Sequence, residues 1–311
     1  MPIEKKISIL GLKGAGKSTF LSILNTALAL EESPWRIHAI GETKEKMKEL
    51  RTYLSKGEYP PQTNEETEME FIVEKEATQL GLQAGAQFKL HAADVPGEAV
   101  KGIASDNSLY KNFYERHLKG CSGVIFLLDY KEVWLNRSRD LDVDTDDYSP
   151  LFSSILDQIF EQTDTDPYVA FCVTKVDMDD RYGPDSKFGI DDNFSADVED
   201  LAESILGRNT KAIIDHGIDR DRIKWLPVSA TGFTENNGKR LRQYMEKVTL
   251  EGVTISAIRK PKELKPIGVA EALEWVLDNL ADDDEDARVV RTRGKKYADM
   301  VKSFRKLFGN R

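Results

Sequence analysis

The segment Gly11–Ser18, with the sequence GLKGAGKS, matches the pattern G-x-x-x-x-G-K-[ST]. Glycines let such a loop curl until successive backbone N–H groups point at phosphate oxygens. Lys17 would then reach the terminal phosphates, and the hydroxyl of Ser18 would bind Mg²⁺. An apolar strand is expected before this loop and an amphipathic helix after it, which is the context that the mechanism requires. The pattern predicts a phosphate-binding loop made of Lys13, Gly14, Ala15, Gly16, Lys17, Ser18 and Thr19.

Short apolar runs alternate with helical patterns along the rest of the chain. Strands are predicted at Ile7–Leu10, Met69–Val73, Phe88–Val95, Gly123–Asp129, Val169–Thr174 and Ile223–Val228. Helices are predicted at Ala15–Leu30, Val100–Leu118, Leu151–Gln162, Ala196–Leu206 and Val269–Leu280. Continuous apolar strands are typical of a sheet that is buried on both faces, whereas the second and third strands alternate and favour an antiparallel hairpin. We therefore predict an α/β fold with a six-stranded, mostly parallel sheet, one antiparallel edge strand and helices on both faces.

Three charged insertions, at residues 33–61, 131–149 and 179–194, interrupt this pattern. We predict that they belong to one domain, residues 1–280. The first insertion contains a charged helical segment, Glu42–Lys56. The second carries spaced aspartates without the glycine and the terminal glutamate of a calcium loop, so a solvated loop is favoured over a calcium site. Residues 281–311 are predicted to form an acidic linker and a basic amphipathic helix.

Three further motifs follow predicted strands. In Asp94-Val95-Pro96-Gly97, Asp94 could hold Mg²⁺ through water and the N–H of Gly97 could contact a γ-phosphate. In Thr174-Lys175-Val176-Asp177, Asp177 could accept hydrogen bonds from N1–H and N2–H₂ of guanine, which adenine does not offer. The backbone N–H groups of Ser229 and Ala230 could reach the guanine O6. Ligands bind at the carboxyl ends of strands in open α/β sheets, so we expect all four motifs to lie together.

With these motifs in this order, the chain resembles a TRAFAC-class P-loop GTPase of the Ras-like kind. Gly11-Leu12 and Asp94-Val95 are similar to the Arf-like branch, while the charged insertion before Pro60-Pro61-Gln62-Thr63 is more similar to prokaryotic relatives, including the double-GTPase group. The resemblance implies GTP, GDP and Mg²⁺ as ligands. It also implies that Thr63 is the switch I threonine and binds Mg²⁺ with Ser18 and Asp94. The alternative is that Thr63 is an ordinary loop threonine.

Several residues depart from the Ras-like pattern. Glu98 stands where Ras-like enzymes often carry a glutamine, and it either accepts a hydrogen bond from the attacking water or points to solvent. Lys13 lies against the phosphates or a partner, or extends into water. Thr174 replaces the more usual asparagine, which removes one amide contact but leaves Asp177 in place. An internal arginine finger is not evident, although Arg51 is a candidate, so we expect slow intrinsic hydrolysis that a partner accelerates.

The predicted function is that of a GTPase, which binds GTP, hydrolyses it to GDP and phosphate, and acts as a nucleotide-dependent molecular switch. Lys17, Thr63, Gly97 and Glu98 are the predicted catalytic residues. Two alternatives are open. A scaffold could bind GTP without hydrolysing it, which Glu98 and Lys13 suggest, and an ATP-dependent ATPase or kinase could share only the phosphate loop.

Charge and cysteine content bear on location and partners. The formal net charge of −10 argues against a nucleic-acid binder that works through overall charge. Cys121 and Cys172 lie in or beside apolar runs and are expected to be buried thiols in a reducing compartment. A secretory pattern and a long apolar segment are both lacking, so we expect a cytoplasmic location.

The end of the chain has a different composition. Residues 288–311 contain nine basic residues and one acid, Asp299. Apolar residues recur there at helical spacing, namely Tyr297, Met300, Val301, Phe304, Leu307 and Phe308. Such a helix could dock on the acidic body of the protein, lie peripherally on the inner membrane surface, or bind a protein or nucleic-acid partner. Activating and effector proteins are further expected partners.

Overall fold

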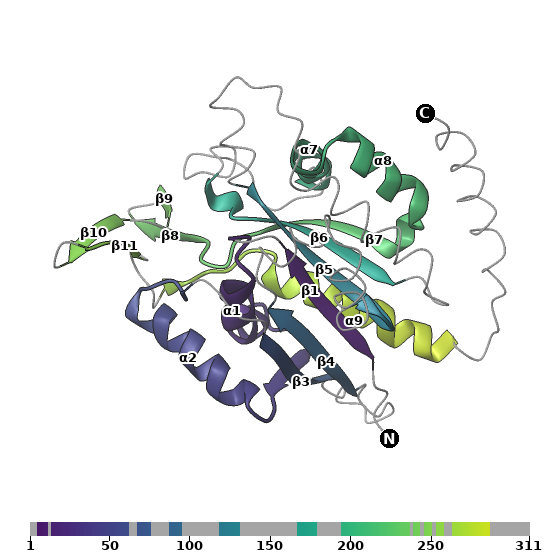
Figure 1. The fold of residues 1–311 in the computed structure, drawn as a ribbon, viewed down its shortest axis with the longest axis horizontal. Helices are drawn as coiled ribbons and strands as arrows, with labels where there is room; N and C mark the ends of the chain where they lie inside the picture. The colour runs from purple at the N-terminus through teal and green to yellow at the C-terminus, as the bar shows by residue number, and fades with distance from the viewer. Residues whose placement is uncertain are drawn as a thin grey trace, which may run out of the picture.

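A four-stranded parallel sheet forms the centre of the fold (Figure 1). The computed structural model describes residues 5–11, 14–61, 67–75, 87–94, 118–130, 167–178, 194–236, 239–242, 246–250, 253–257 and 263–286. The strands of the central sheet, in spatial order, are β1 (Lys6–Gly11), β5 (Cys121–Asp129), β6 (Tyr168–Thr174) and β7 (Ile223–Val228). Each neighbouring pair is parallel, so the carboxyl ends of these strands share one edge of the sheet.

A three-stranded antiparallel sheet continues this layer. It consists of β2 (Trp35–Ala39), β3 (Thr67–Lys75) and β4 (Gln87–Asp94), in that order. Strand β4 lies beside β1, which places the antiparallel sheet next to the parallel one (Figure 1). The predicted antiparallel pairing of the second and third strands is confirmed by the register of β3 and β4.

The predicted count of six strands is wrong, because the two sheets contain four and three strands. The additional strand, β2, lies inside the first insertion, where only a helix was expected. Its side chains alternate in burial: Trp35 and Ile37 are buried, whereas Arg36 is half-buried and His38 is exposed. This alternation lets β2 cover the edge of β3 while it faces solvent on the other side.

Helices cover both faces of the sheet, as predicted. One face carries α1 (Lys17–Leu30), α2 (Thr43–Lys56) and α9 (Val269–Asp286), and the other carries α7 (Phe194–Leu206) and α8 (Arg208–Gly217). Alternate residues of β5 pack into different cores. Phe126 lies in the core beneath α7, whereas Ile125 and Leu127 lie in the core beneath α1 and α9. Burial on both faces explains why β5 is continuously apolar.

Several segments were not predicted from the sequence, and several predictions fall outside the described residues. Helix α8 and two hairpins between β7 and α9 were not expected. The hairpins are formed by β8 (Phe233–Asn236) with β9 (Lys239–Arg242) and by β10 (Glu246–Leu250) with β11 (Val253–Ala257). The helix predicted at Leu151–Gln162, the acidic loop at 131–149 and the basic segment 288–311 lie outside the described residues. The same holds for residues 100–117 of the helix predicted at Val100–Leu118 and for residues 179–193 of the insertion predicted at 179–194.

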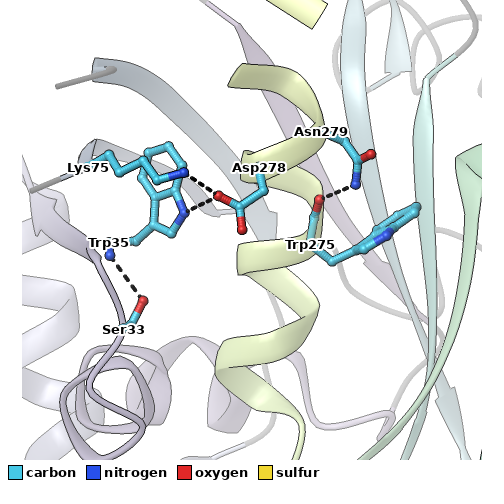
Figure 2. Close-up of polar contacts among 6 residues, drawn as sticks. All are labelled: Ser33, Trp35, Lys75, Trp275, Asp278 and Asn279. Carbon is cyan, nitrogen blue, oxygen red and sulfur yellow. Dashed lines mark hydrogen bonds and ion pairs between the residues drawn. The ribbon is translucent and has the colours of Figure 1, made fainter. Parts of the chain in front are cut away.

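Asp278 joins α9 to the antiparallel sheet (Figure 2). Its Oδ1 accepts hydrogen bonds from Lys75 Nζ at 2.7 Å and from Trp35 Nε1 at 3.1 Å. Trp35 and Lys75 are cross-strand partners in the register of β2 and β3. Two residues further along α9, the carbonyl oxygen of Leu280 accepts a hydrogen bond from the Nζ of Lys5, the residue just before β1. These contacts therefore lie at the edge of the sheet where β1 begins.

Both cysteines are free and buried, as predicted. Burial raises the pKa of Cys121 to about 11 and raises the pKa of Cys172 further still, so both thiols are protonated at neutral pH. Among the helices in the part of the chain that the structure describes, none is both long and apolar enough to cross a lipid bilayer.

Candidate nucleotide-binding site

The phosphate loop leaves the carboxyl end of β1 and runs into α1. Gly14 and Gly16 have φ angles of 86° and 90°, in the left-handed region that favours glycine. These two residues let the backbone reverse direction before the helix starts at Lys17. Within the described residues, α1 begins without a side-chain cap and without an acidic residue in its first turn. An anion at this helix start would therefore meet the positive end of the helix dipole without competition from an acidic side chain in the first turn of α1.

Lys17 lies across the loop. Its side chain is only 6% exposed, and its Nζ donates a hydrogen bond to the carbonyl oxygen of Gly11 at 2.9 Å. The ammonium group is thus held over the same turn that Gly14 and Gly16 shape. Ser18 and Thr19 follow in the first turn of α1, both half-buried. This arrangement brings together the residues predicted to contact phosphate, apart from Lys13, which lies outside the described residues.

Thr174 ties the end of β6 to the phosphate loop. Its hydroxyl lies 2.9 Å from the carbonyl oxygen of Ala15 and 3.1 Å from that of Leu128, the last residue but one of β5. The side chain is buried, with 5% exposure. A buried carbonyl without a partner is costly, so this hydroxyl stabilises the joint between three strand ends. Direct contact between Thr174 and a nucleotide stays a prediction.

Asp177 and Ser229 join the motifs that follow β6 and β7. Ser229 Oγ donates a hydrogen bond to Asp177 Oδ1 at 2.7 Å and accepts one from the backbone N–H of Gly232 at 2.8 Å. Asp177 is 3% exposed and Ser229 is 1% exposed. The backbone of Ser229 also forms a bridge with Ile267, just before α9. The carboxylate of Asp177 is therefore held in one orientation, with Ala230 on the neighbouring loop.

Lys175 points toward the phosphate loop. Its Nζ donates to Asp129 Oδ2 at 2.6 Å, and its own backbone has a left-handed φ of 61°. Asp129 ends β5, and its side chain is only 6% exposed. Its Oδ2 lies 3.7 Å from the position that a Cβ on Gly14 would occupy. Asp129 was not predicted from the sequence to have a role, although an acid at the end of a continuously apolar strand was a usable signal.

The side chains of the remaining predicted site residues lie outside what the structure describes. Asp94 ends β4 beside β1, which is the expected edge, but its side chain lies outside what the structure describes. Thr63, Gly97 and Glu98 also lie outside the described residues. Their catalytic and magnesium-binding roles stay predictions. Across the described ranges, no cluster of three or more His, Cys, Asp or Glu residues could hold a metal ion.

Together, the fold and these motifs define a P-loop GTPase domain. Residues 8–163 match the model of the family described as Double-GTPase 1. The match spans half of the chain and includes the phosphate loop, Thr63, Asp94 and Gly97. The chain therefore belongs to the Double-GTPase 1 family. The segments that contain Thr174, Asp177 and Ser229 lie beyond the matched residues.

Several solved structures are similar to this chain at low sequence identity. The GTP-bound Ski7 GTPase-like domain of S. cerevisiae is 16% identical with a TM-score of 0.41, over 74% of this chain and 44% of that one. The signal recognition particle receptor SRb-GTP/SRX complex from Chaetomium thermophilum is 16% identical with a TM-score of 0.38, over 76% and 95%. The Arl6 BBS3 small GTPase from Trypanosoma brucei, with bound GppNp, is 12% identical with a TM-score of 0.35, over 90% and 99%. This chain spans less than half the length of the Ski7 chain, and its sequence has no significant match among curated proteins.

Proposed function

We propose that this chain binds GTP, hydrolyses it slowly to GDP and phosphate, and works as a nucleotide-dependent switch. The observation that carries the proposal is the direct bonding between motifs that are far apart in the sequence. Thr174 bonds to Ala15 in the phosphate loop, and Ser229 bonds to Asp177. Both contacts lie at the carboxyl ends of the parallel strands, where open α/β sheets bind their ligands.

Base recognition is assigned to Asp177. A carboxylate accepts several hydrogen bonds, and guanine offers N1–H and N2–H₂ on one edge. Because Ser229 fixes the orientation of this carboxylate, little side-chain entropy remains to be lost when a base binds. The backbone of Ser229 and Ala230 is adjacent and would meet the guanine O6. Adenine has an acceptor at N1 and would be repelled at the same place.

Phosphate binding is assigned to the loop and to the start of α1. Lys17 supplies a positive charge that is already held over the loop, and the N–H groups of the first helical turn supply oriented donors. Ser18 has the hydroxyl and the position that suit Mg²⁺, with Thr63 and Asp94 as its proposed co-ligands. The metal ion would neutralise charge that develops on the β- and γ-phosphates.

Hydrolysis and switching are assigned to the segments around Thr63, Gly97 and Glu98. The N–H of Gly97 would contact the γ-phosphate, and Glu98 would accept a hydrogen bond from the attacking water. A carboxylate next to a γ-phosphate is repelled by it, so intrinsic hydrolysis should be slow and should need an activating partner. A cytoplasmic location, with peripheral membrane contact through residues 288–311, belongs to the same proposal.

The test is equilibrium binding of fluorescent GTP, GDP and ATP in the presence of Mg²⁺, followed by phosphate release in a single turnover. We expect tight guanine-nucleotide binding and slow release that exceeds the uncatalysed rate. Guanine binding without any release would replace the switch with a GTP-loaded scaffold. A preference for ATP would overturn the assignment of Asp177, and unchanged binding by Lys17→Ala would overturn the phosphate loop.

A further inference from the structure

Among the described residues, Lys17 and Lys175 both lie at the phosphate loop, and the structure gives them different kinds of partner. Lys17 Nζ donates to a carbonyl oxygen, that of Gly11, at 2.9 Å. Lys175 Nζ donates to a carboxylate oxygen, that of Asp129, at 2.6 Å. A carbonyl contact leaves the charge of an ammonium group in place, whereas a carboxylate contact cancels it. The ammonium group of Lys175 is therefore paired with an opposite charge beside the loop.

The pair of Lys175 and Asp129 lies next to the loop backbone. Asp129 Oδ2 is 3.7 Å from the Cβ position of Gly14, and the carboxylate side chain is 6% exposed. Charge-assisted hydrogen bonds of this length are among the stronger ones, and a nearly buried carboxylate gains most from such a partner. The register pairs Asp129 with Thr174, the residue before Lys175, so the pairing of β5 and β6 brings the two charges together.

The backbone of Lys175 supports a functional interpretation. Its φ of 61° is one of two left-handed values outside glycine among the described residues. Such a conformation costs free energy for a residue with a Cβ. Here it turns the side chain back toward the phosphate loop, two residues before Asp177, which we have assigned to the base. The aliphatic part of Lys175 therefore spans the region between the base-binding loop and the phosphate loop.

We propose that Asp129 is a positioning residue of the guanine-nucleotide site, an inference that rests on the proposed function. Its carboxylate holds the ammonium group of Lys175 at Gly14, so that Lys175 lies along the base side of the site. The pair adds no net charge next to the phosphates. Phosphate binding is then left to Lys17 and to the start of α1.

The proposal is tested through the ratio of GDP to GMP affinity, because GDP carries more negative charge than GMP on the same base. We would measure both dissociation constants by calorimetry at fixed Mg²⁺ and salt, for the full chain and for Asp129→Asn, Lys175→Met and the double variant. Asp129→Asn leaves a net positive charge and should shift the ratio about fivefold in favour of GDP. Lys175→Met leaves a net negative charge and should shift the ratio about fivefold in favour of GMP. The double variant is neutral again and should restore the original ratio.

A purely structural ion pair predicts a different result. Loss of such an ion pair would lower the affinities for GDP and for GMP by the same factor. An unchanged ratio of GDP to GMP affinity in either folded single variant would therefore overturn the proposal. Each single variant is informative alone, so failure of one to fold leaves the other as the test. The matched control is Asp278→Asn, which changes an acid that pairs with Lys75 at 2.7 Å at the opposite edge of the sheet and should leave the ratio unaltered. If the wild-type chain binds neither nucleotide, the proposed function itself has failed.

Discussion

The hydroxyl of Thr174 donates a hydrogen bond to the carbonyl oxygen of Ala15 at 2.9 Å, and this contact joins the motif predicted to bind guanine to the phosphate loop. The resemblance to Ras-like GTPases made asparagine the more usual residue at this position. The structure shows that a threonine can make the joint, because its single hydroxyl lies within reach of both Ala15 and Leu128. The segment proposed to bind the base and the phosphate loop are thus held together before any ligand is considered.

Thr174→Val should lower the free energy of unfolding by about 1–2 kcal/mol, since it keeps the shape of the side chain and removes the hydroxyl that donates to the carbonyl oxygen of buried Ala15. Nucleotide affinity should also fall several-fold. Urea unfolding and GDP titration measure the two effects. Thr174→Ser keeps the hydroxyl and should behave like the wild-type chain. Equal stability of the valine and serine variants would show that the bond contributes nothing.

Gly16→Ala should lower stability by roughly 1–2 kcal/mol, because alanine is strained at a φ of 90°. A Cβ at this position would have no atom within 4 Å among those described, so the cost comes from the backbone alone. Gly41→Ala is the matched control, with a φ of 53° and a similarly open surrounding. Both variants should lose stability in thermal unfolding, but only Gly16→Ala should lose nucleotide binding. Equal nucleotide affinity in the two variants would contradict the role of the loop.

Asp278→Ala should destabilise the chain by about 1–2 kcal/mol, since it removes the acceptor of the fully buried Trp35 as well as the ion pair with Lys75. Lys75→Met removes a half-exposed ion pair and the cation–π contact of Lys75 with the Trp35 ring, and should cost less, about 0.5 kcal/mol. The order of the two variants in urea unfolding is the measurement. A larger loss of stability in Lys75→Met than in Asp278→Ala would mean that Lys75, and not the indole N–H of Trp35, makes the main stabilising contact between α9 and the antiparallel sheet.

Glu31 should make stability depend on pH. Partial desolvation, together with the nearby carboxylates of Glu274 and Glu271, raises the pKa of Glu31 to about 7 from its ordinary value of 4.5. Because its pKa is higher in the folded chain than in the unfolded chain, this carboxyl loses its proton more readily in the unfolded chain. The free energy of unfolding therefore falls as pH rises from 4.5 to 7. Glu31→Gln should remove this loss. Its gain in melting temperature should be small at pH 4.5 and larger at pH 8.

Glu32→Gln is the control for Glu31, because it changes the net charge equally at the adjacent position. The same pH-dependent gain in both variants would assign the effect to net charge. If the difference in melting temperature between Glu31→Gln and the wild-type chain does not change across this pH range, Glu31 is not desolvated.

Strands buried on both faces were the part of the fold most accessible from the sequence. The strands β5 and β6 were predicted to within two residues, because continuous apolar runs of that length, bounded by polar residues, leave few alternatives. The strand β2 was missed, since five residues inside a charged insertion carry too little signal against a neighbouring helical pattern. Its burial depends on Phe88 and α9, which are far away in the sequence.

In the candidate site too, some features could be predicted from the sequence and others could not. Motif spacing was sufficient to predict that Gly14, Lys17, Asp177 and Ser229 lie at one edge of the sheet. The pairing of Asp129 with Lys175 could not be predicted, because it depends on the register between β5 and β6, and a shift of one residue would move Asp129 to the other face. Local pattern thus identifies strand ends, while the contacts between them follow from tertiary pairing.

The most direct test of the account is the base preference of Asp177→Asn, measured as the dissociation constants of GDP and xanthosine diphosphate. Xanthine carries a carbonyl oxygen at C2 where guanine carries an amino group, so an amide donor suits it and a carboxylate repels it. We predict that the variant loses GDP affinity roughly ten- to hundredfold and gains affinity for xanthosine diphosphate. Wild-type affinity for GDP in a folded Asp177→Asn variant would contradict the assignment of this site to guanine nucleotides.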